Sequence, residues 1–300
     1  MALPEFDYIA AKSYEEASKL MTSMGSECVV MSGGTDVILQ IPKFVSRGMK
    51  TVIDLKSVPE QTRLEFVEGE GLYVGANTKL FDIQSSPVVL DKMPAVAQAA
   101  HYVGSNQVRR KGTMVGSICN ASPTGDCGSI LLAMNAKVKI YSAENGTREV
   151  AMDDFWPGFK KIAADKSKGE LVTEIFIPEL KSGEGSAYFK HSVRKAMDLA
   201  IVGVAAWVKM DGKKVADCRI AVAGGDVTIV RAKKAEQMLI GNELTEELLE
   251  KATVQAADEM NPRSSLRASA EYRHDMIRVY TKRAVNKAIE TMKKSEAKRS

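Results

Sequence analysis

Two stretches of the sequence combine glycines with hydroxyl and amide side chains, a composition suited to holding a phosphate-bearing ligand. The first is S-G-G-T-D at 32–36, and the second is G-T-M-V-G-S-I-C-N-A-S-P-T-G-D at 112–126. Glycines let the backbone approach a ligand closely, and backbone N–H groups that line a concavity bind anions. Asp126 is the one carboxylate of the second stretch, and it suits a sugar hydroxyl. Together the stretches predict a dinucleotide held from two sides.

Taken alone, the first stretch has a simpler interpretation as a tight turn with Thr35 or Asp36 as a helix N-cap. The sequence contains neither G-x-G-x-x-G nor G-x-x-x-x-G-K followed by serine or threonine. Their absence excludes a Rossmann fingerprint and a P-loop. The four cysteines are Cys28, Cys119, Cys127 and Cys218, with no C-x-x-C pair among them. We therefore expect free thiols and no metal bound by this chain.

Composition narrows the class of protein. The 300 residues carry a formal net charge of +4, which is too small to indicate a nucleic-acid partner. No run approaches the roughly 20 apolar residues of a membrane span. Residues 1–8 lack the basic start and apolar core of a signal peptide, so we expect a cytoplasmic protein without a membrane span.

The first part of the chain predicts helices and strands that place both stretches. Ser13 caps a helix over 11–21, with Glu16 completing a capping box. The stretch at 32–36 follows a buried strand at 28–31 and precedes a helix that Pro42 ends at residue 41. The other expected elements are strands at 51–55, 137–141 and 171–177, a short strand from Val150, a hairpin at 64–75, and helices at 80–84, 96–102 and 129–134.

A linker rich in glycine, serine and charge is expected at 178–185, and a different pattern follows it. Strands at 187–192, 200–209 and 215–222 precede helices at 231–240, 245–260 and 269–292. Strands followed by helices indicate an α+β unit. The predicted divisions are a first lobe at 1–57, a second lobe at 58–178, a C-terminal domain at 186–292 and a basic tail at 293–300.

Five motifs in this order resemble a known family. They are S-G-G-T-D, Q-V-R at 107–109, the stretch at 112–126, F-K-H-S-V-R-K-A-M-D at 189–198 and P-R-S-S-L-R-A-S-A-E-Y-R at 262–273. The chain resembles the FAD-binding subunit of molybdenum hydroxylases, most closely the medium subunit of bacterial xanthine dehydrogenases. The resemblance implies an α+β fold: a two-lobed FAD-binding domain of the PCMH/vanillyl-alcohol-oxidase type, then a smaller C-terminal domain with an antiparallel sheet and helices.

The resemblance also implies cofactor-binding residues. The FAD diphosphate would be wrapped by Val30, Met31, Ser32, Gly33, Gly34, Thr35, Asp36 and Val37, and by a second loop of Thr113, Met114, Val115, Gly116 and Ser117. Asp126 would bind a ribityl or ribose hydroxyl, Val103 and Val172 would lie near the cofactor, and Lys190 would favour the reduced flavin anion. Where the family usually has T-I-G-G-N or T-V-G-G-N, this chain has T-M-V-G-S. Val115 would therefore add bulk where backbone should approach the ligand.

In such proteins electrons leave a large molybdopterin subunit, cross two 2Fe–2S clusters on a small subunit, and reach FAD. The resemblance implies that this chain passes them to NAD or another acceptor, in a dimer of heterotrimers that acts on purines or N-heterocycles. No side chain is expected to act as a catalytic acid or base, since the chemistry belongs to the flavin. Two alternatives stay open: a stand-alone flavin oxidoreductase, and an assembly subunit poor in cofactor.

Overall fold

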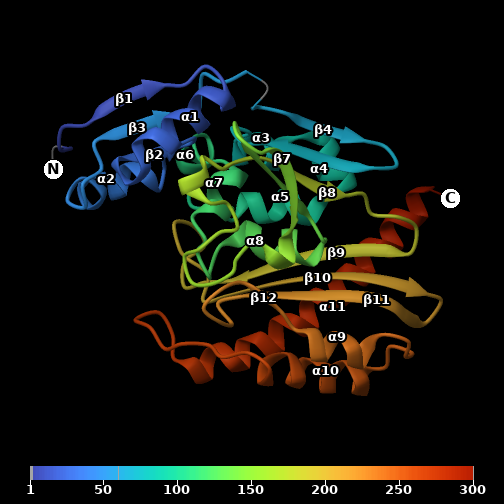
Figure 1. The fold of residues 1–300 in the computed structure, drawn as a ribbon. Coiled ribbons are helices and arrows are strands. Elements are labelled where there is room, and N and C mark those ends of the chain that lie inside the picture. The colour runs from blue at the N-terminus through green and yellow to red at the C-terminus, as the bar shows by residue number, and fades with distance from the viewer. Residues whose placement is uncertain (1–2, 60, 300) are drawn as a thin grey trace.

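A computed structural model describes residues 3–59 and 61–299 and contains three β-sheets in chain order (Figure 1). The first sheet is parallel, in the order β1-β3-β2, with strands β1 (Asp7–Ala10), β2 (Cys28–Met31) and β3 (Thr51–Asp54). It carries α1 (Tyr14–Met24), the 3₁₀ turn η1 (Gly25–Glu27) and α2 (Val37–Val45). The Ser13 hydroxyl accepts from the Glu16 N–H at 3.0 Å, which confirms the predicted N-cap.

The expectation that Pro42 ends its helix is wrong. Helix α2 continues through Pro42 to Val45, and the Pro42 carbonyl accepts from the Ser46 N–H at 3.1 Å. Proline forfeits one helical hydrogen bond. Ile41 is fully buried against the sheet, and Phe44 and Val45 pack on the same cluster. Burial of this apolar face therefore outweighs the lost hydrogen bond.

The second sheet is antiparallel, in the order β4-β5-β8-β6-β7. Its strands are β4 (Leu64–Val67), β5 (Gly71–Gly75), β6 (Lys137–Ser142), β7 (Gly146–Ala151) and β8 (Leu171–Pro178). Six helices join them: α3 (Leu80–Ser85), α4 (Pro87–Lys92), α5 (Pro94–His101), α6 (Asn106–Arg109), α7 (Met114–Cys119) and α8 (Asp126–Ala133). The 3₁₀ turns η2 (Met152–Asp154) and η3 (Lys166–Lys168) complete this part. The predicted hairpin and the strands at 137–141 and 171–177 are present. The strand expected to begin at Val150 instead begins at Gly146 and ends at Ala151, and α8 begins three residues earlier than expected.

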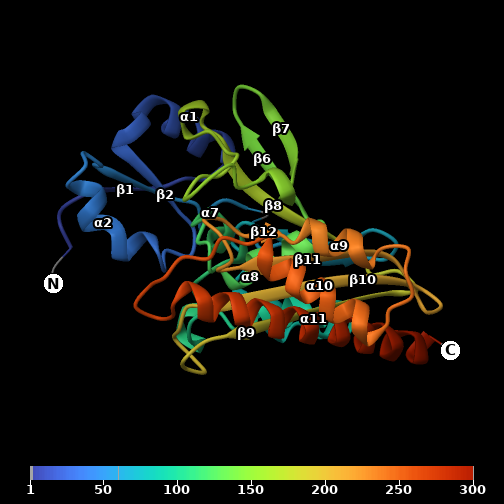
Figure 2. The ribbon, with the colours of Figure 1, turned by 90° about the horizontal axis from the view of Figure 1, so that it is seen from below.

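The third sheet is antiparallel, in the order β12-β11-β10-β9, with α9 to α11 on one face (Figure 2). Its strands are β9 (Glu184–His191), β10 (Val202–Asp211), β11 (Lys214–Ala223) and β12 (Val230–Arg231). The helices are α9 (Lys233–Leu239), α10 (Glu246–Asp258) and α11 (Ala270–Arg299). The strands-then-helices pattern is confirmed. Helix α11 runs past residue 292, so the basic segment expected as a tail continues the helix.

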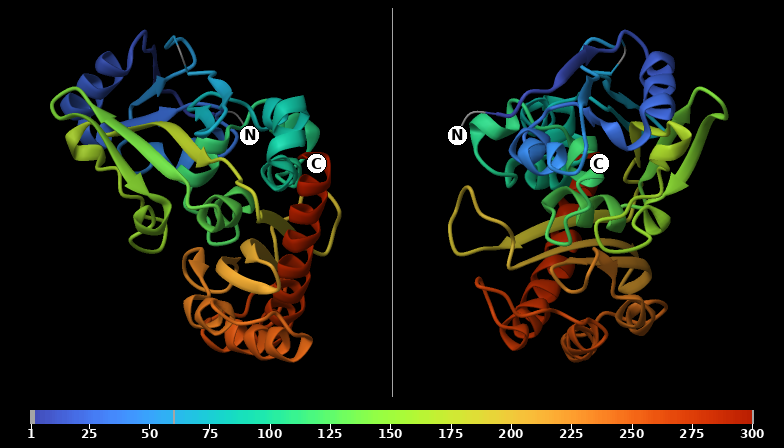
Figure 3. Two further views of the ribbon diagram at one scale, coloured as in Figure 1. Left: turned by 90° about the vertical axis from the view of Figure 1, so that its right-hand side faces the viewer. Right: turned by 60° about the vertical axis from the view of Figure 1, so that its left-hand side comes forward.

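Side-chain alternation along β10 places this sheet between two cores. Val204, Ala206 and Val208 face the α9–α11 helices, whereas Ala205 and Trp207 join the core built on α5, α8 and the second sheet. The first sheet and helices α9 and α10 lie at opposite ends of the molecule, and the last turns of α11 extend back toward the N-terminal half (Figure 3). In the part of the chain that the structure describes, no helix has the length and hydropathy to cross a membrane.

Candidate cofactor site

The two glycine-containing stretches touch through their backbones. A Cβ built on Gly33 would lie 2.2 Å from the Lys111 carbonyl oxygen and 2.9 Å from the Gly112 Cα. A Cβ on Gly112 would lie 3.3 Å from the Thr35 Oγ1. Only glycine at 33 permits this approach. The fold thus joins the end of β2 to the segment that precedes α7.

Hydrogen bonds fix the first stretch beside the second sheet. The Ser32 hydroxyl donates to the Ala76 carbonyl oxygen at 3.1 Å and also contacts the Asn77 side chain. The Asn77 amide in turn donates to the Leu55 carbonyl oxygen at 3.0 Å. Gly34 has a φ of 77°, which favours glycine. Within residues 3–59 and 61–299 the backbone N–H groups of residues 33–35 have no protein acceptor, so they remain able to bind an anion.

The second stretch begins a helix, which corrects the expectation of a continuous loop. Thr113 caps α7, and its hydroxyl accepts from the Gly116 N–H at 3.0 Å. The Gly112 carbonyl oxygen accepts from the Leu80 N–H at 2.9 Å, which holds the cap against α3. Among the described residues no hydrogen bond is found for the Val115 N–H, whereas Met114 is fully buried beside the β-bridge between Lys79 and Thr113. Free N–H groups at a helix start bind anions.

Val115 points away from this open surface. Its side chain is 4% exposed and belongs to the core formed with α5, α8 and the second sheet, so its bulk is directed inward. A Cβ on the neighbouring Gly116 would meet only the Thr113 Oγ1, at 3.0 Å. The backbone of Gly116 is therefore only partly covered. The side chains of Met114 and Val115, by contrast, are buried in the core.

These groups fit a diphosphate, because both stretches offer free N–H groups and glycine surfaces that a Cβ would otherwise cover. The arrangement differs from a metal site. No cluster of three or more histidine, cysteine or acidic side chains occurs in the described part of the chain. The four cysteines are free thiols, and burial raises the pKa of Cys119 and Cys127 to about 12 each.

Asp126 and Lys190 form a buried ion pair that joins α8 to β9. The Lys190 Nζ lies 2.9 Å from the Asp126 Oδ2, and the Tyr188 hydroxyl donates to the Asp126 Oδ1 at 2.8 Å. Lys190 also donates to the carbonyl oxygens of Tyr102 and Asp198, at 3.0 and 2.8 Å. Burial raises the pKa of Asp126, and the positive charge of Lys190 opposes that shift. Three protein acceptors thus surround the ammonium group.

The remaining predicted residues lie in strands, helices and loops around this core. Val30 and Val37 are half-buried and pack on the two cores of the first sheet. Val103 follows α5, and its carbonyl oxygen accepts from Arg109 at 3.0 Å. Val172, in β8, is buried in the same core as Val115. The structure therefore brings the two glycine stretches together, and it places the ion pair at the opposite end of the second stretch.

A loop that the sequence analysis did not assign packs against this site. The Trp156 Nε1 donates to the Ile118 carbonyl oxygen at 3.0 Å, and the Lys160 Nζ donates to the Asn120 carbonyl oxygen at 2.9 Å. Lys160 and Ala121 have positive φ values of 56° and 48°. The Pro157-Gly158 pair marks a turn, but nothing in the sequence shows what that turn contacts.

The C-terminal sheet also reaches the second stretch. The Gly224 N–H, just after β11, donates to the Pro123 carbonyl oxygen at 2.7 Å. The side chain of Ile229 lies against Gly128 of α8, where a Cβ would approach its Cδ1 to 2.4 Å. The third sheet therefore supports the segment between α7 and α8.

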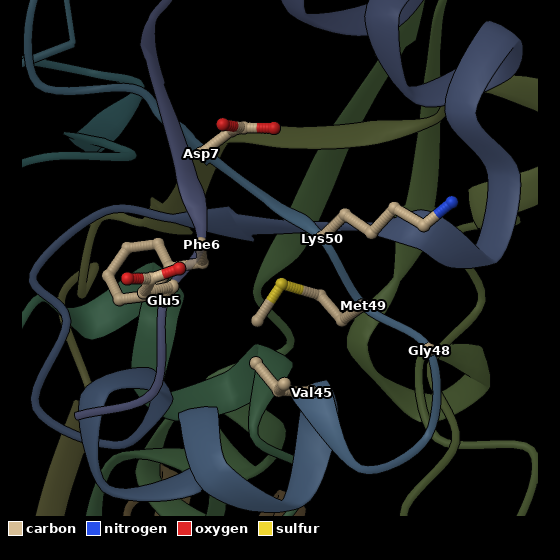
Figure 4. A pocket seen from close by; sticks show the side chains of 7 residues that line it. All are labelled: Glu5, Phe6, Asp7, Val45, Gly48, Met49 and Lys50. Carbon is tan, nitrogen blue, oxygen red and sulfur yellow. The ribbon is translucent and has the colours of Figure 1, made fainter.

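A separate pocket lies at the other edge of the first sheet (Figure 4). Its lining residues are Glu5, Phe6, Asp7, Val45, Gly48, Met49 and Lys50. The strands are parallel, so this edge holds their N-terminal ends, whereas Ser32 follows the carboxyl end of β2. The pocket contains none of the predicted site residues.

Comparisons with known proteins agree with this geometry. Residues 4–180 match the family model described as the FAD binding domain in molybdopterin dehydrogenase, and residues 187–288 match the CO dehydrogenase flavoprotein C-terminal domain. The chain is 33% identical to the glyceraldehyde dehydrogenase medium chain of Sulfolobus acidocaldarius, over 94% of this chain and 97% of that protein. It is 29% identical to a putative xanthine dehydrogenase FAD-binding subunit of Escherichia coli, over 92% and 96%.

A solved structure matches nearly the whole chain. It is a carbon monoxide dehydrogenase from Hydrogenophaga pseudoflava that lacks the Mo-pyranopterin moiety of its molybdenum cofactor. The match has a TM-score of 0.89 and 31% identity, and it covers 96% of this chain and 98% of the other. The expected fold class, a PCMH-type FAD-binding domain followed by a C-terminal α+β domain, is thereby confirmed.

Proposed function

This chain belongs to the family of FAD-binding medium subunits of molybdenum hydroxylases, and from that premise we propose that it carries electrons from the 2Fe–2S clusters of a small partner subunit to NAD or another acceptor. The observation that supports this function best is the backbone contact between Gly33 and Lys111, which brings the two glycine-containing stretches together. FAD, when bound, supplies a redox centre that takes up electrons and releases a pair as hydride.

Each predicted residue then has a role in holding this cofactor. We assign the diphosphate to the free N–H groups of residues 33–35 and to that of Val115. Asp126 is assigned to a ribityl or ribose hydroxyl, because each carboxylate oxygen can accept a further hydrogen bond beside those from Tyr188 and Lys190. The buried charge of Lys190 favours negative charge in its surroundings. Val103 and Val172 provide apolar contacts.

We propose a small iron–sulfur subunit and a large molybdopterin subunit as partners, in a cytoplasmic dimer of heterotrimers. We assign choice of substrate to the large partner. Relatives named for glyceraldehyde, xanthine, nicotine and carbon monoxide are all 29% to 33% identical to this chain. The identity to this chain is thus nearly the same for relatives named for unrelated substrates. This favours a subunit that transfers electrons, and it does not favour purines over the other substrate classes.

Reconstitution tests the proposal. The full chain is incubated with excess FAD, freed of unbound nucleotide, and its absorption spectrum and heat-released nucleotide are recorded. We expect bound FAD in preference to FMN, because the diphosphate lies in the proposed contacts. No bound flavin would overturn the function and favour an assembly subunit. Turnover of an organic substrate by the chain alone would instead favour a stand-alone oxidoreductase.

The electron route needs the assembled complex. After substrate reduces the complex, the flavin and iron–sulfur absorption bands are followed while NAD is added. We expect both to reoxidise. If the clusters are reduced while the flavin stays oxidised, the proposed route is wrong even though FAD binds.

A further inference from the structure

Lys160 occupies a backbone conformation that lysine rarely adopts. Its φ is 56°, and it is the third residue of a turn in which the Lys161 N–H donates to the Gly158 carbonyl oxygen at 3.0 Å. A positive φ at that position of a turn is ordinarily met by glycine or asparagine. A side chain with a Cβ is unfavourable there, and such outliers gather at functional sites. The turn therefore holds Lys160 in an unfavourable backbone conformation.

The turn holds the Lys160 ammonium group at the second glycine stretch. Trp156 anchors the start of the loop through its indole N–H to the Ile118 carbonyl oxygen. The Lys160 Nζ donates to the Asn120 carbonyl oxygen at 2.9 Å and lies 3.4 Å from the Asn120 Oδ1. Asn120 follows the last residue of α7, the helix that Thr113 caps.

The charges of Lys160 and Asp36, in the first stretch, act on each other. Partial removal from water raises the pKa of the Asp36 carboxyl group, and the charge of Lys160 opposes that rise. Partial burial likewise lowers the pKa of Lys160, while Asp36 opposes it. The ammonium group therefore contacts the second stretch directly, and its charge also acts on the carboxyl group of the first stretch.

We propose that Lys160 supplies the positive charge that holds the FAD diphosphate against the two glycine stretches. This proposal rests on the proposed function. An ammonium group has three donors, and Asn120 is the acceptor that the structure describes for them. A diphosphate oxygen can take a donor left free by Asn120. Backbone N–H groups orient the anion, and the ammonium group compensates its charge.

A purely structural role makes a different prediction. Lys160 lies at the C-terminal end of α7, where a cation stabilises the helix carbonyls. In that case its removal lowers the stability of the FAD-free chain and affects all ligands alike. A role toward the diphosphate instead separates ligands that carry a diphosphate from those that do not.

The experiment compares three full-length variants with the parent chain. They are Lys160→Met, Lys160→Arg and, as a matched control, Lys161→Met at the neighbouring exposed lysine. Dissociation constants are measured for FAD, for ADP in competition with FAD, and for riboflavin, across a series of KCl concentrations. Urea unfolding of each FAD-free variant reports its stability.

We expect Lys160→Met to weaken FAD and ADP binding by about 10- to 100-fold, the range of one charge-assisted hydrogen bond. Riboflavin binding should change less than about twofold. The salt dependence of FAD binding should become shallower, because one screened charge pair is lost. Lys160→Arg should keep most of the affinity, and Lys161→Met all of it.

Three results would overturn the proposal. One is FAD affinity in Lys160→Met within about twofold of the parent chain. Another is a loss for FAD that ADP does not share, and the third is an equal loss for riboflavin. Failure of the parent chain itself to bind FAD would reject the proposed function as well, so the two failures are distinguishable.

Discussion

Val115 stands where the family usually has glycine, and its replacement tests whether the valine side chain packs in the core or obstructs the cofactor. The side chain is 4% exposed and lies in the first turn of α7. Full burial of a valine side chain contributes about 1.5–3 kcal/mol. Glycine in a helix costs up to about 1 kcal/mol relative to alanine. Val115→Gly is therefore expected to lower the free energy of unfolding by about 2–4 kcal/mol, and Val115→Ala should lose the burial component alone.

The assay combines urea unfolding of the FAD-free chain with FAD titration by flavin fluorescence. Because α7 begins at the proposed diphosphate contacts, loosening its first turn should leave FAD affinity unchanged or weaker. Val115→Ala separates the lost packing from the added backbone freedom. A glycine variant with unchanged stability and tighter FAD binding would refute the reasoning, since it would show that the valine side chain obstructs the ligand.

Three further changes test other contacts. Gly33→Ala places a Cβ 2.2 Å from the Lys111 carbonyl oxygen, so the stretches must separate; we expect about 1–3 kcal/mol lower stability in urea and weaker FAD binding, and unchanged values for both would contradict the contact. Lys190→Met leaves Asp126 buried without its cation and should cost roughly 3–5 kcal/mol at neutral pH, measured by urea unfolding; a loss below about 0.5 kcal/mol would show that the pair contributes little. Burial and the charge of Arg283 lower the pKa of His191 in the folded state. The unfolded chain then binds more protons below the ordinary histidine pKa near 6.5, so stability falls as pH drops through that range; His191→Gln should flatten this part of the stability profile, and an equally steep decline would contradict the assignment.

Local patterns made much of the fold predictable. Ser13 and Glu16 predict the start of a helix, and α1 begins there. The alternation of polar and apolar residues along 137–141 predicts a half-buried strand, which is β6. Thr113 ahead of two apolar residues is an N-cap signal of the same kind. That signal was available for α7, but the small residues around it favoured a loop.

Tertiary contacts could not be predicted in the same way. The approach of Gly33 to Lys111 depends on how two sheets pack, and neither residue's neighbours in sequence encode the other's position. The family resemblance named Asp126 and Lys190 separately, whereas their pairing follows from β9 lying beside α8. The positive φ of Lys160 depends equally on context, because nothing in its residue type favours that conformation.

The contact between the stretches has a consequence for how freely this sequence can vary. The contact requires that residue 33 has no side chain. Residue 111 takes part only through its carbonyl oxygen, which every amino acid possesses. A saturation library should therefore accept almost any replacement at 111 and almost none at 33. The same contact thus restricts substitution strongly at residue 33 and hardly at all at residue 111.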